Sequence, residues 1–202
     1  MGRIWKNCGD MMRKQSFQEK RQIAIEEKDI QGKYLPQGLP TILKNDLKNR
    51  NGFQIEIKED KGFFFYGDTG IGKSYQAAYA ANELAKLRND PNAGFWVNIP
   101  KLLHQIKRSF GTNQEDLIEK YSSVPILCLD DLGSEQSSDW VMQTLYIIIN
   151  SRYEEMLTTI ITSNLSPLEL SEKMKDNRLI SRISSMCEVL EVKGKDKRKK
   201  VI

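Results

Sequence analysis

The 202-residue sequence is poor in the residues that nucleophilic catalysis and structural metal sites use. Its one histidine is His104, and its three cysteines, Cys8, Cys128 and Cys187, lie far apart with no C-x-x-C pair. An odd number of scattered cysteines argues against a disulfide framework or a zinc module. A Ser-His or Cys-His catalytic pair would depend on His104, which has no signature nucleophile nearby. We therefore expect a reducing, cytoplasmic setting.

Long apolar runs are also missing. No run approaches the roughly 18 residues of a membrane span, and residues 1–15 lack the apolar core of a secretory signal. We therefore expect no membrane partner. The charge balance is 31 Lys and Arg against 27 Asp and Glu, or +4. This excess is too small to indicate a nucleic-acid partner, so the placement of the charges matters more than their sum.

From residue 62 onward, strand-like apolar runs alternate with helical patterns. Runs suited to buried strands occupy residues 62–66, 93–99, 124–131, 158–164 and 187–192. Helical patterns occupy residues 41–48, 75–88, 101–110 and 177–183, and a further helix is expected after a cap at Ser137 or Ser138. This alternation predicts an α/β fold in which a five-stranded parallel sheet is sandwiched by helices.

A glycine-rich loop joins the first strand of this pattern to an alanine-rich helix. It matches G-x-x-x-x-G-K-[ST], the signature of a phosphate-binding P-loop. Its backbone N–H groups can surround a phosphate, its lysine can reach the β- and γ-phosphates of ATP, and its serine can ligate Mg²⁺. We therefore expect ATP to bind at Gly67, Asp68, Thr69, Gly70, Ile71, Gly72, Lys73 and Ser74.

Two later strands end in polar residues that suit the same site. ILCLDD ends in Asp130 and Asp131, and the strand at 158–164 ends in Thr-Ser-Asn164. Ligands of open α/β sheets bind at the carboxyl ends of the strands. We expect Asp130 to hold Mg²⁺ together with Ser74, Asp131 to polarise the attacking water, and Asn164 to orient that water or contact the γ-phosphate.

Taken in order, GDTGIGKS, ILCLDDLG, the helix from SSDW to NSRYE, and TIITSNLS resemble the DnaC/IstB-like AAA+ ATPases. This family comprises bacterial and phage helicase loaders and transposition helper ATPases. The resemblance covers residues from about 62 to 198. It implies a P-loop NTPase fold with an AAA+ core, ATP and Mg²⁺ as cofactors, and an ATPase activity.

The resemblance also implies roles for three arginines and for Asn164. Asn164 would be the sensor that reads the γ-phosphate. Arg182 is similar in position to an arginine finger that reaches the ATP of a neighbouring subunit, and Arg178 is the alternative for that role. Arg198, in a G-x-x-x-R pattern, would sense nucleotide. Such a finger would make catalysis depend on self-association through the ATP site.

The sequence outside the motifs predicts two parts, residues 1–40 as an N-terminal arm and residues 41–202 as the AAA+ domain with a basic tail. The charged helical pattern at 16–30 is typical of either a solvated arm or a helicase-docking helix. The tail carries six basic residues and one acid between Lys193 and Lys200. We expect no C-terminal helical lid, which the resembled family also lacks.

The helix expected at 101–110 is the candidate DNA-binding surface. Lys101, Lys107 and Arg108 lie off its apolar face, and phosphate contacts from them would give sequence-tolerant binding to single-stranded DNA. The resembled family uses this region to grip single-stranded DNA. Phe110 shares the apolar spacing of Leu103 and Ile106, so we expect it in the core rather than stacked on a base.

The leading functional prediction is an ATPase that binds single-stranded DNA and helps load a replicative hexameric helicase. The same motifs fit a transposition helper that acts with a transposase on duplex DNA. A small-molecule kinase is disfavoured, because paired acids suit hydrolysis and an amphipathic helix follows the third strand where an Arg-rich lid would be needed. A non-hydrolysing, ATP-gated adaptor stays open until turnover is measured.

Overall fold

The computed structural model describes residues 32–49, 57 and 61–196. The expected helix at 16–30, most of the expected arm, and Arg198 with the end of the basic tail lie outside these residues. Within the described part of the chain, no helix is both long enough and apolar enough to cross a membrane.

One parallel sheet organises the molecule. Its strands stand in the order β2-β3-β4-β1-β5, and all four neighbouring pairs are parallel. The predicted five-stranded parallel sheet is therefore confirmed. The strands are β1 (Gly62–Tyr66), β2 (Gly94–Asn98), β3 (Ile126–Leu132), β4 (Thr158–Ser163) and β5 (Cys187–Glu191).

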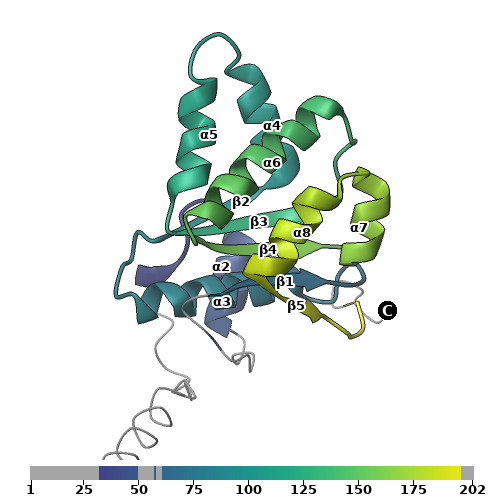
Figure 1. Cartoon of the computed structure of the whole chain (residues 1–202). Coiled ribbons are helices and arrows are strands. Elements are labelled where there is room, and N and C mark those ends of the chain that lie inside the picture. Colours follow the sequence, from purple (N-terminus) through teal and green to yellow (C-terminus); the bar gives the residue numbers. More distant parts are fainter. Residues whose placement is uncertain (1–31, 50–56, 58–60, 197–202) are drawn as a thin grey trace, which may run out of the picture.

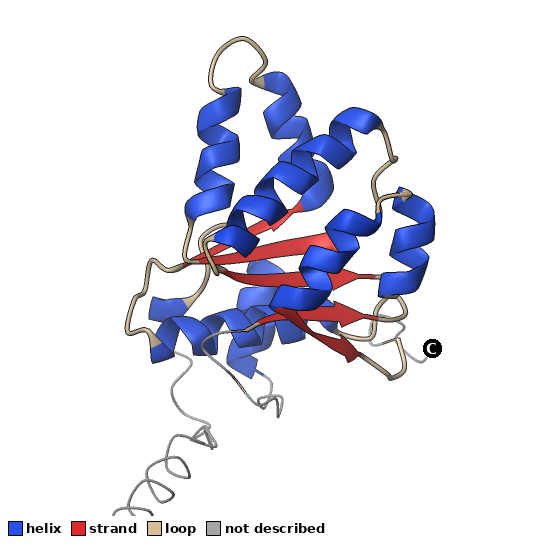
Figure 2. Ribbon diagram, viewed as in Figure 1, coloured by secondary structure: helices blue, strands red, loops and turns tan. Residues whose placement is uncertain are grey.

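Helices cover both faces of the sheet, as Figures 1 and 2 show. One face packs against α2 (Thr41–Asn49) and α3 (Lys73–Leu87), with the short 3₁₀ helix η1 (Gly32–Tyr34) beside them. The other face packs against a larger group of helices: α4 (Ile99–Arg108), α5 (Gln114–Ser123), α6 (Asp139–Glu154), α7 (Pro167–Met174) and α8 (Asn177–Met186).

The strand β1 shows why the sheet needs two helical layers. Phe63 and Phe65 point to the α3 side, and Phe64 points to the α6 and α8 side. All three rings are buried, so the period-two alternation of a strand places bulky apolar groups on both faces. The GFFFY run is therefore a central strand of the sheet.

Two helices were not expected from the sequence. The N-terminus of α7 carries a capping box, in which Ser166 accepts from the Glu169 N–H and Glu169 accepts from the Ser166 N–H. The sequence Ser-Pro-x-Glu is a typical signature of a helix N-terminus, so this helix could have been predicted from the sequence. In α5 only Tyr121 is fully buried, and Asn113 at its N-cap makes no capping hydrogen bond, so its signal is weak.

The expectation that Phe110 packs in the core is wrong. The helix α4 ends at Arg108, and the chain turns through Gly111 at a φ of 80°. Phe110 therefore leaves the apolar face of Leu103 and Ile106, and it is 58% exposed. Its ring lies 6.1 Å from the ring of Trp140 at the start of α6.

Residues 36–39 close the outer edge of β2. The Gln37 N–H donates to the Gly94 carbonyl at 2.9 Å, and the Trp96 N–H donates to the Gln37 carbonyl at 2.7 Å. Leu39, just beyond, is buried against the α2–α3 side of the sheet. These residues, which were expected in the arm, thus pack against the sheet.

A buried arginine ties the amino ends of the central strands to α6. Arg152 is 0% exposed, and its guanidinium donates to the carbonyls of Val124 and Thr158, each at 2.7 Å, and to the Thr159 hydroxyl at 2.9 Å. Further bonds reach the carbonyls of Tyr121 and Ser122 at the end of α5. Burial lowers the pKa of Arg152 to about 9, so these acceptors surround a cation at neutral pH.

We expect Arg152→Met to lower the free energy of unfolding by about 3 kcal/mol, because the substitution leaves several buried carbonyls without a donor. Chemical denaturation measures this change. Lys107→Met, which removes an exposed cation, is the control and should stay within about 0.5 kcal/mol of the parent. Equal midpoints for all three proteins would contradict the structural role of Arg152.

Candidate functional site

The P-loop connects the carboxyl end of β1 to the N-terminus of α3. Gly67, Gly70 and Gly72 have φ values of 135°, 81° and 107°, a region that side chains with a Cβ rarely adopt. Gly72 is the N-cap of α3, so the first N–H groups of that helix face the loop. The loop and the helix dipole together form a cradle for an anionic group such as a phosphate.

Lys73 crosses this cradle. Its ammonium donates to the carbonyls of Gly67 at 2.9 Å and Asp68 at 2.6 Å, and to the Asn164 side-chain oxygen at 2.8 Å. These bonds hold a buried ammonium at the mouth of the loop. The bond to Asn164 joins the start of α3 to the residue that follows β4, and β4 is the neighbour of β1 in the sheet.

An irregularity in β3 places the two acids. Its pairing with β4 shifts between Leu129 and Leu132, so that one more residue is inserted on the β3 side. Asp131 has a φ of 69°, an uncommon conformation for a residue other than glycine. Bulges of this kind redirect side chains beside active sites. Here the Asp130 carboxylate contacts the P-loop helix and β4, and the Asp131 carboxylate faces Asn164 at the end of β4.

The hydroxyl of Thr162 fixes both acids at once. It donates to Asp130 Oδ1 at 2.8 Å and accepts from the Asp131 N–H at 2.9 Å. The Ser74 hydroxyl also donates to Asp130 Oδ1 at 2.8 Å. The side chains of Ser74, Asp130 and Thr162 therefore meet at one point, although they come from three different elements.

The donor set fits a divalent cation. Burial raises the pKa of Asp130, the hydrogen bonds from Thr162 and Ser74 oppose that rise, and the neighbouring Asp131 carboxylate adds to it. A cation would relieve the repulsion of two adjacent carboxylates. Hydroxyl and carboxylate oxygens are the ligands that Mg²⁺ prefers.

Asn164 lies between the lysine and the acids. Its oxygen accepts from Lys73, and its amide nitrogen is 3.4 Å from Asp131 Oδ1. The amide oxygen thus contacts the P-loop lysine, and the amide nitrogen lies beside the second acid. The structure brings together the P-loop residues, Asp130, Asp131 and Asn164, as the sequence predicted for a single site.

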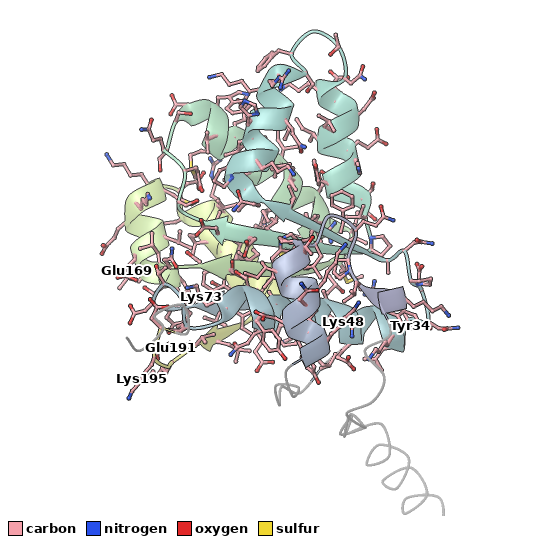
Figure 3. All side chains as sticks on the ribbon, turned by 180° about the vertical axis from the view of Figure 1, so that it is seen from behind. Tyr34, Lys48, Lys73, Glu169, Glu191 and Lys195 are labelled. Carbon is pink, nitrogen blue, oxygen red and sulfur yellow. The ribbon has the colours of Figure 1, made fainter. Side chains whose placement is uncertain are left out.

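The chain beyond β5 runs along the P-loop. The Val192 N–H donates to the Tyr66 carbonyl at 2.8 Å. A Cβ at Gly67 would collide with the Val192 carbonyl, and a Cβ at Gly70 would collide with the Asp196 carboxylate. Lys73, Glu191 and Lys195 accordingly lie at the same end of the molecule in Figure 3. Gly67 is therefore needed for the close approach of the Val192 backbone as well as for its backbone angle, whereas the flexible Asp196 side chain could move away from a Cβ at Gly70.

The two candidate finger arginines lie away from this site. Both are on α8, on the face of the sheet opposite α3. Arg182 donates to the Asn150 oxygen at 3.0 Å and lies over the Tyr153 ring, both on α6. Arg178 pairs with Asp176. The structure therefore does not bring either arginine to the P-loop of its own chain.

The candidate DNA-binding residues form an exposed group on α4. Lys101, Lys107 and Arg108 are all exposed, while Leu102, Leu103 and Ile106 are buried beneath them. Phe110 adds an exposed ring at the end of this helix. The resulting surface combines cations with an aromatic group.

Two residues at the site were missed as functional candidates. Thr162 was noted only as part of a polar strand end, although its hydroxyl connects both acids. A strand of β-branched residues that ends in Thr-Ser-Asn is the signal that could have singled it out. Asp196 was treated as one acid in a basic tail, and nothing in its local sequence indicates that it approaches Gly70.

These features define the class of P-loop NTPases: a P-loop follows β1, a pair of acids ends β3, and the polar Asn164 lies between the P-loop lysine and those acids. The strand order is that of an AAA+ core. Residues 48–201 match the family described as IstB-like ATP binding protein. The chain belongs to this family.

The curated relatives include the replicative helicase loader DnaI of Bacillus subtilis strain 168, which is 29% identical over 156 residues. That match covers 71% of this chain and 49% of DnaI, so the chain spans about half the length of this relative. The chromosomal replication initiator DnaA of Neisseria meningitidis is 28% identical over 123 residues, which is 60% of this chain and 23% of DnaA.

Solved structures show the same likeness. A crystal structure of DnaI superposes with a TM-score of 0.59 at 31% identity, over 75% of this chain and 81% of that one. The DnaC helicase loader gives 0.57 at 27% identity, over 75% and 86%. AMPPCP-bound DnaA from Aquifex aeolicus, at 24% identity, TM-score 0.55, and coverage of 75% and 44%, shares the fold.

We expect Lys73→Ala to weaken ATP binding at least about 100-fold, because it removes charged hydrogen bonds to the phosphates. Isothermal titration calorimetry measures the affinity. Lys86→Ala, on the same helix but paired with Glu83, is the matched control and should bind ATP normally. Normal affinity in Lys73→Ala would refute the P-loop assignment.

Proposed function

We propose that this protein hydrolyses ATP and uses that cycle to help load a replicative DNA helicase onto single-stranded DNA. The observation that carries the proposal is the meeting of Lys73, the two acids and Asn164 at one edge of the sheet. They meet in a chain that is similar to the helicase loader DnaI. The proposed site contains residues 67–74, Asp130, Asp131 and Asn164.

The proposed chemistry assigns one task to each side chain. The P-loop N–H groups and Lys73 bind the phosphates, and Ser74 and Asp130 hold Mg²⁺, which when bound neutralises charge on the phosphoryl group. Asp131 accepts a hydrogen bond from the attacking water and increases its nucleophilicity. Asn164 orients that water, because its amide already spans the distance between Lys73 and Asp131. Arg198 would add a nucleotide-sensing cation.

A second copy of the chain would complete this site. Arg182 lies on the face opposite α3 and contacts only α6 among its described partners, so its guanidinium does not serve the ATP of its own chain. An arginine supplied by a neighbour stabilises charge on the γ-phosphoryl oxygens in the transition state. We therefore propose self-association in which Arg182 faces the P-loop of the adjacent subunit.

We further propose that the exposed face of α4 binds single-stranded DNA. Lys101, Lys107 and Arg108 would contact phosphates, and the exposed Phe110 ring is available to stack on a base. The alternative is a transposition helper that acts with a transposase on duplex DNA, which the family description leaves equally open. The likeness to DnaI and DnaC favours the loader.

The partner decides between these functions. We expect the full chain to form a complex with the hexameric replicative helicase of its source organism and, with ATP, to deliver that helicase to closed circular single-stranded DNA. Lys73→Ala should fail in delivery, and Lys86→Ala should succeed. Capture of a transposase instead of the helicase would contradict the loader and support the alternative.

The DNA-binding surface predicts a salt-dependent affinity. We expect Lys107→Ala/Arg108→Ala to weaken binding to single-stranded DNA about tenfold and to lower the salt slope by about two, one unit for each lost phosphate contact. Fluorescence anisotropy at several salt concentrations measures both. Lys48→Ala/Lys61→Ala, a pair of exposed lysines elsewhere, is the charge-matched control. Tighter binding of duplex than of single-stranded DNA would favour the transposition helper.

A further inference from the structure

We propose that Asn150 and Tyr153 are positioning residues that hold Arg182 through uncharged groups, so that its full positive charge is available to the ATP of a second copy of this chain. This inference rests on the proposed ATPase function. It separates the roles of two arginines that the sequence leaves as alternatives.

Two side chains of α6 hold Arg182. Its Nε donates to Asn150 Oδ1 at 3.0 Å, and its guanidinium carbon lies 4.6 Å from the centre of the Tyr153 ring. A hydrogen bond and a cation–π contact on two sides restrict a long and otherwise flexible side chain. Neither contact is a hydrogen bond from the two terminal nitrogens of the guanidinium. These nitrogens can therefore donate a bidentate pair of hydrogen bonds to a phosphoryl group.

The orientation of Asn150 is itself fixed. Its Nδ2 donates to Glu154 Oε1 at 2.8 Å, one helical turn further along α6. Because the amide nitrogen is engaged there, the amide oxygen faces Arg182. Glu154 therefore determines which end of the amide the arginine meets, because the amide nitrogen bonds Glu154 and the amide oxygen bonds Arg182.

Arg178 offers a direct comparison on the same helix. It also lies over a tyrosine of α6, with Tyr146 at 5.0 Å, but it forms two bonds to Asp176, at 3.1 and 3.3 Å. Those bonds raise the pKa of Arg178 and lower the pKa of Asp176. Its charge is thus already paired with a carboxylate.

The difference in partners has a chemical consequence. An arginine that must stabilise a γ-phosphoryl group has to exchange its resting partner for the phosphate. An amide oxygen and a ring release the guanidinium readily, and they do not cancel its charge, whereas a carboxylate competes with the phosphate as an anion. Among the described residues, no carboxylate forms an ion pair with Arg182.

The placement of the two helices suits this role. The contact between α6 and α8 lies on the side of the sheet opposite α3, as Figure 1 shows, and so away from the P-loop helix of the same chain. Ser138 caps the N-terminus of α6 shortly after the two acids of β3, and Asn150 and Tyr153 lie near its other end. A single helix therefore runs from the loop that follows the two acids to the residues that hold Arg182.

Asn150→Asp is the decisive substitution, because it keeps the size of the side chain and changes only its charge. We expect its assembly-dependent kcat to fall about tenfold or more, a part of the roughly 10³-fold that an arginine finger supplies. The KM for ATP and the melting temperature should not change. Glu154→Gln is combined with Asn150→Asp to remove the repulsion between the two carboxylates, and the loss should persist in the double variant.

The ring is tested separately. Tyr153→Leu should lower kcat, and Tyr153→Phe should restore it, since the cation–π contact needs the ring and not the hydroxyl. The matched controls act on the other arginine: Tyr146→Leu and Asp176→Asn should leave kcat at the parent value. Normal turnover in both Asn150→Asp/Glu154→Gln and Tyr153→Leu would overturn the proposal.

A spectroscopic readout is independent of turnover. The Nε–H resonance of Arg182 should be protected from solvent exchange in the parent protein and should lose that protection in Asn150→Ala, whereas that of Arg178 should be unaffected. An unprotected Arg182 resonance in the parent protein would overturn the proposal even if no ATP is hydrolysed.

Subunit mixing separates this inference from the function on which it rests. Arg182→Ala subunits should regain some activity when mixed with Asp131→Asn subunits, because each supplies what the other lacks. Full turnover by Arg182→Ala alone would refute the in-trans arginine. An inactive Arg182→Ala beside fully active Asn150 and Tyr153 variants would refute only the positioning roles.

Discussion

The hydroxyl of Thr162 is the interaction on which the geometry of the site depends. Because β4 is inserted between β1 and β3, its last residues lie between the P-loop and the two acids. The hydroxyl holds one carboxylate and the backbone of the other, so the irregular end of β3 has a defined shape. A valine at this position would fill the same space but would leave Asp130 and the Asp131 N–H without this partner.

Most of the fold could be predicted because strong local patterns coincide with the tertiary structure. The five strands are short, apolar and separated by helical segments, and the P-loop motif locates β1 and α3 together. The failures have physical causes. The start of α7 was readable from its Ser-Pro-x-Glu, whereas α5 buries little and carries almost no periodic signal. Phe110 continues the apolar spacing of α4 but lies beyond its end at Arg108. Apolar periodicity alone does not show where a helix ends.

The meeting of these side chains was predictable for a different reason. Each stands at the end of a strand or in the loop and helix start that follow it, and parallel strands all end at one edge. What the sequence could not supply is the identity of the partners across elements. In our proposal, the choice between Arg178 and Arg182 rests on the partner of each guanidinium, which is a carboxylate for Arg178 and an amide for Arg182. Asp176 is two residues from Arg178 in the sequence, whereas Asn150 is 32 residues from Arg182. The contact between Asn150 and Arg182 is formed only because α6 packs on α8.

The strand-like contact of Gln37 has a consequence for how the domain can be isolated. The family match begins at residue 48, but the Gly94 carbonyl and the Trp96 N–H are satisfied by a residue upstream of it. A fragment cut at that boundary would lose Leu39 from the core and leave β2 as a bare sheet edge, open to pairing with the edge of another molecule. The smallest unit that folds without this liability therefore begins before Pro36.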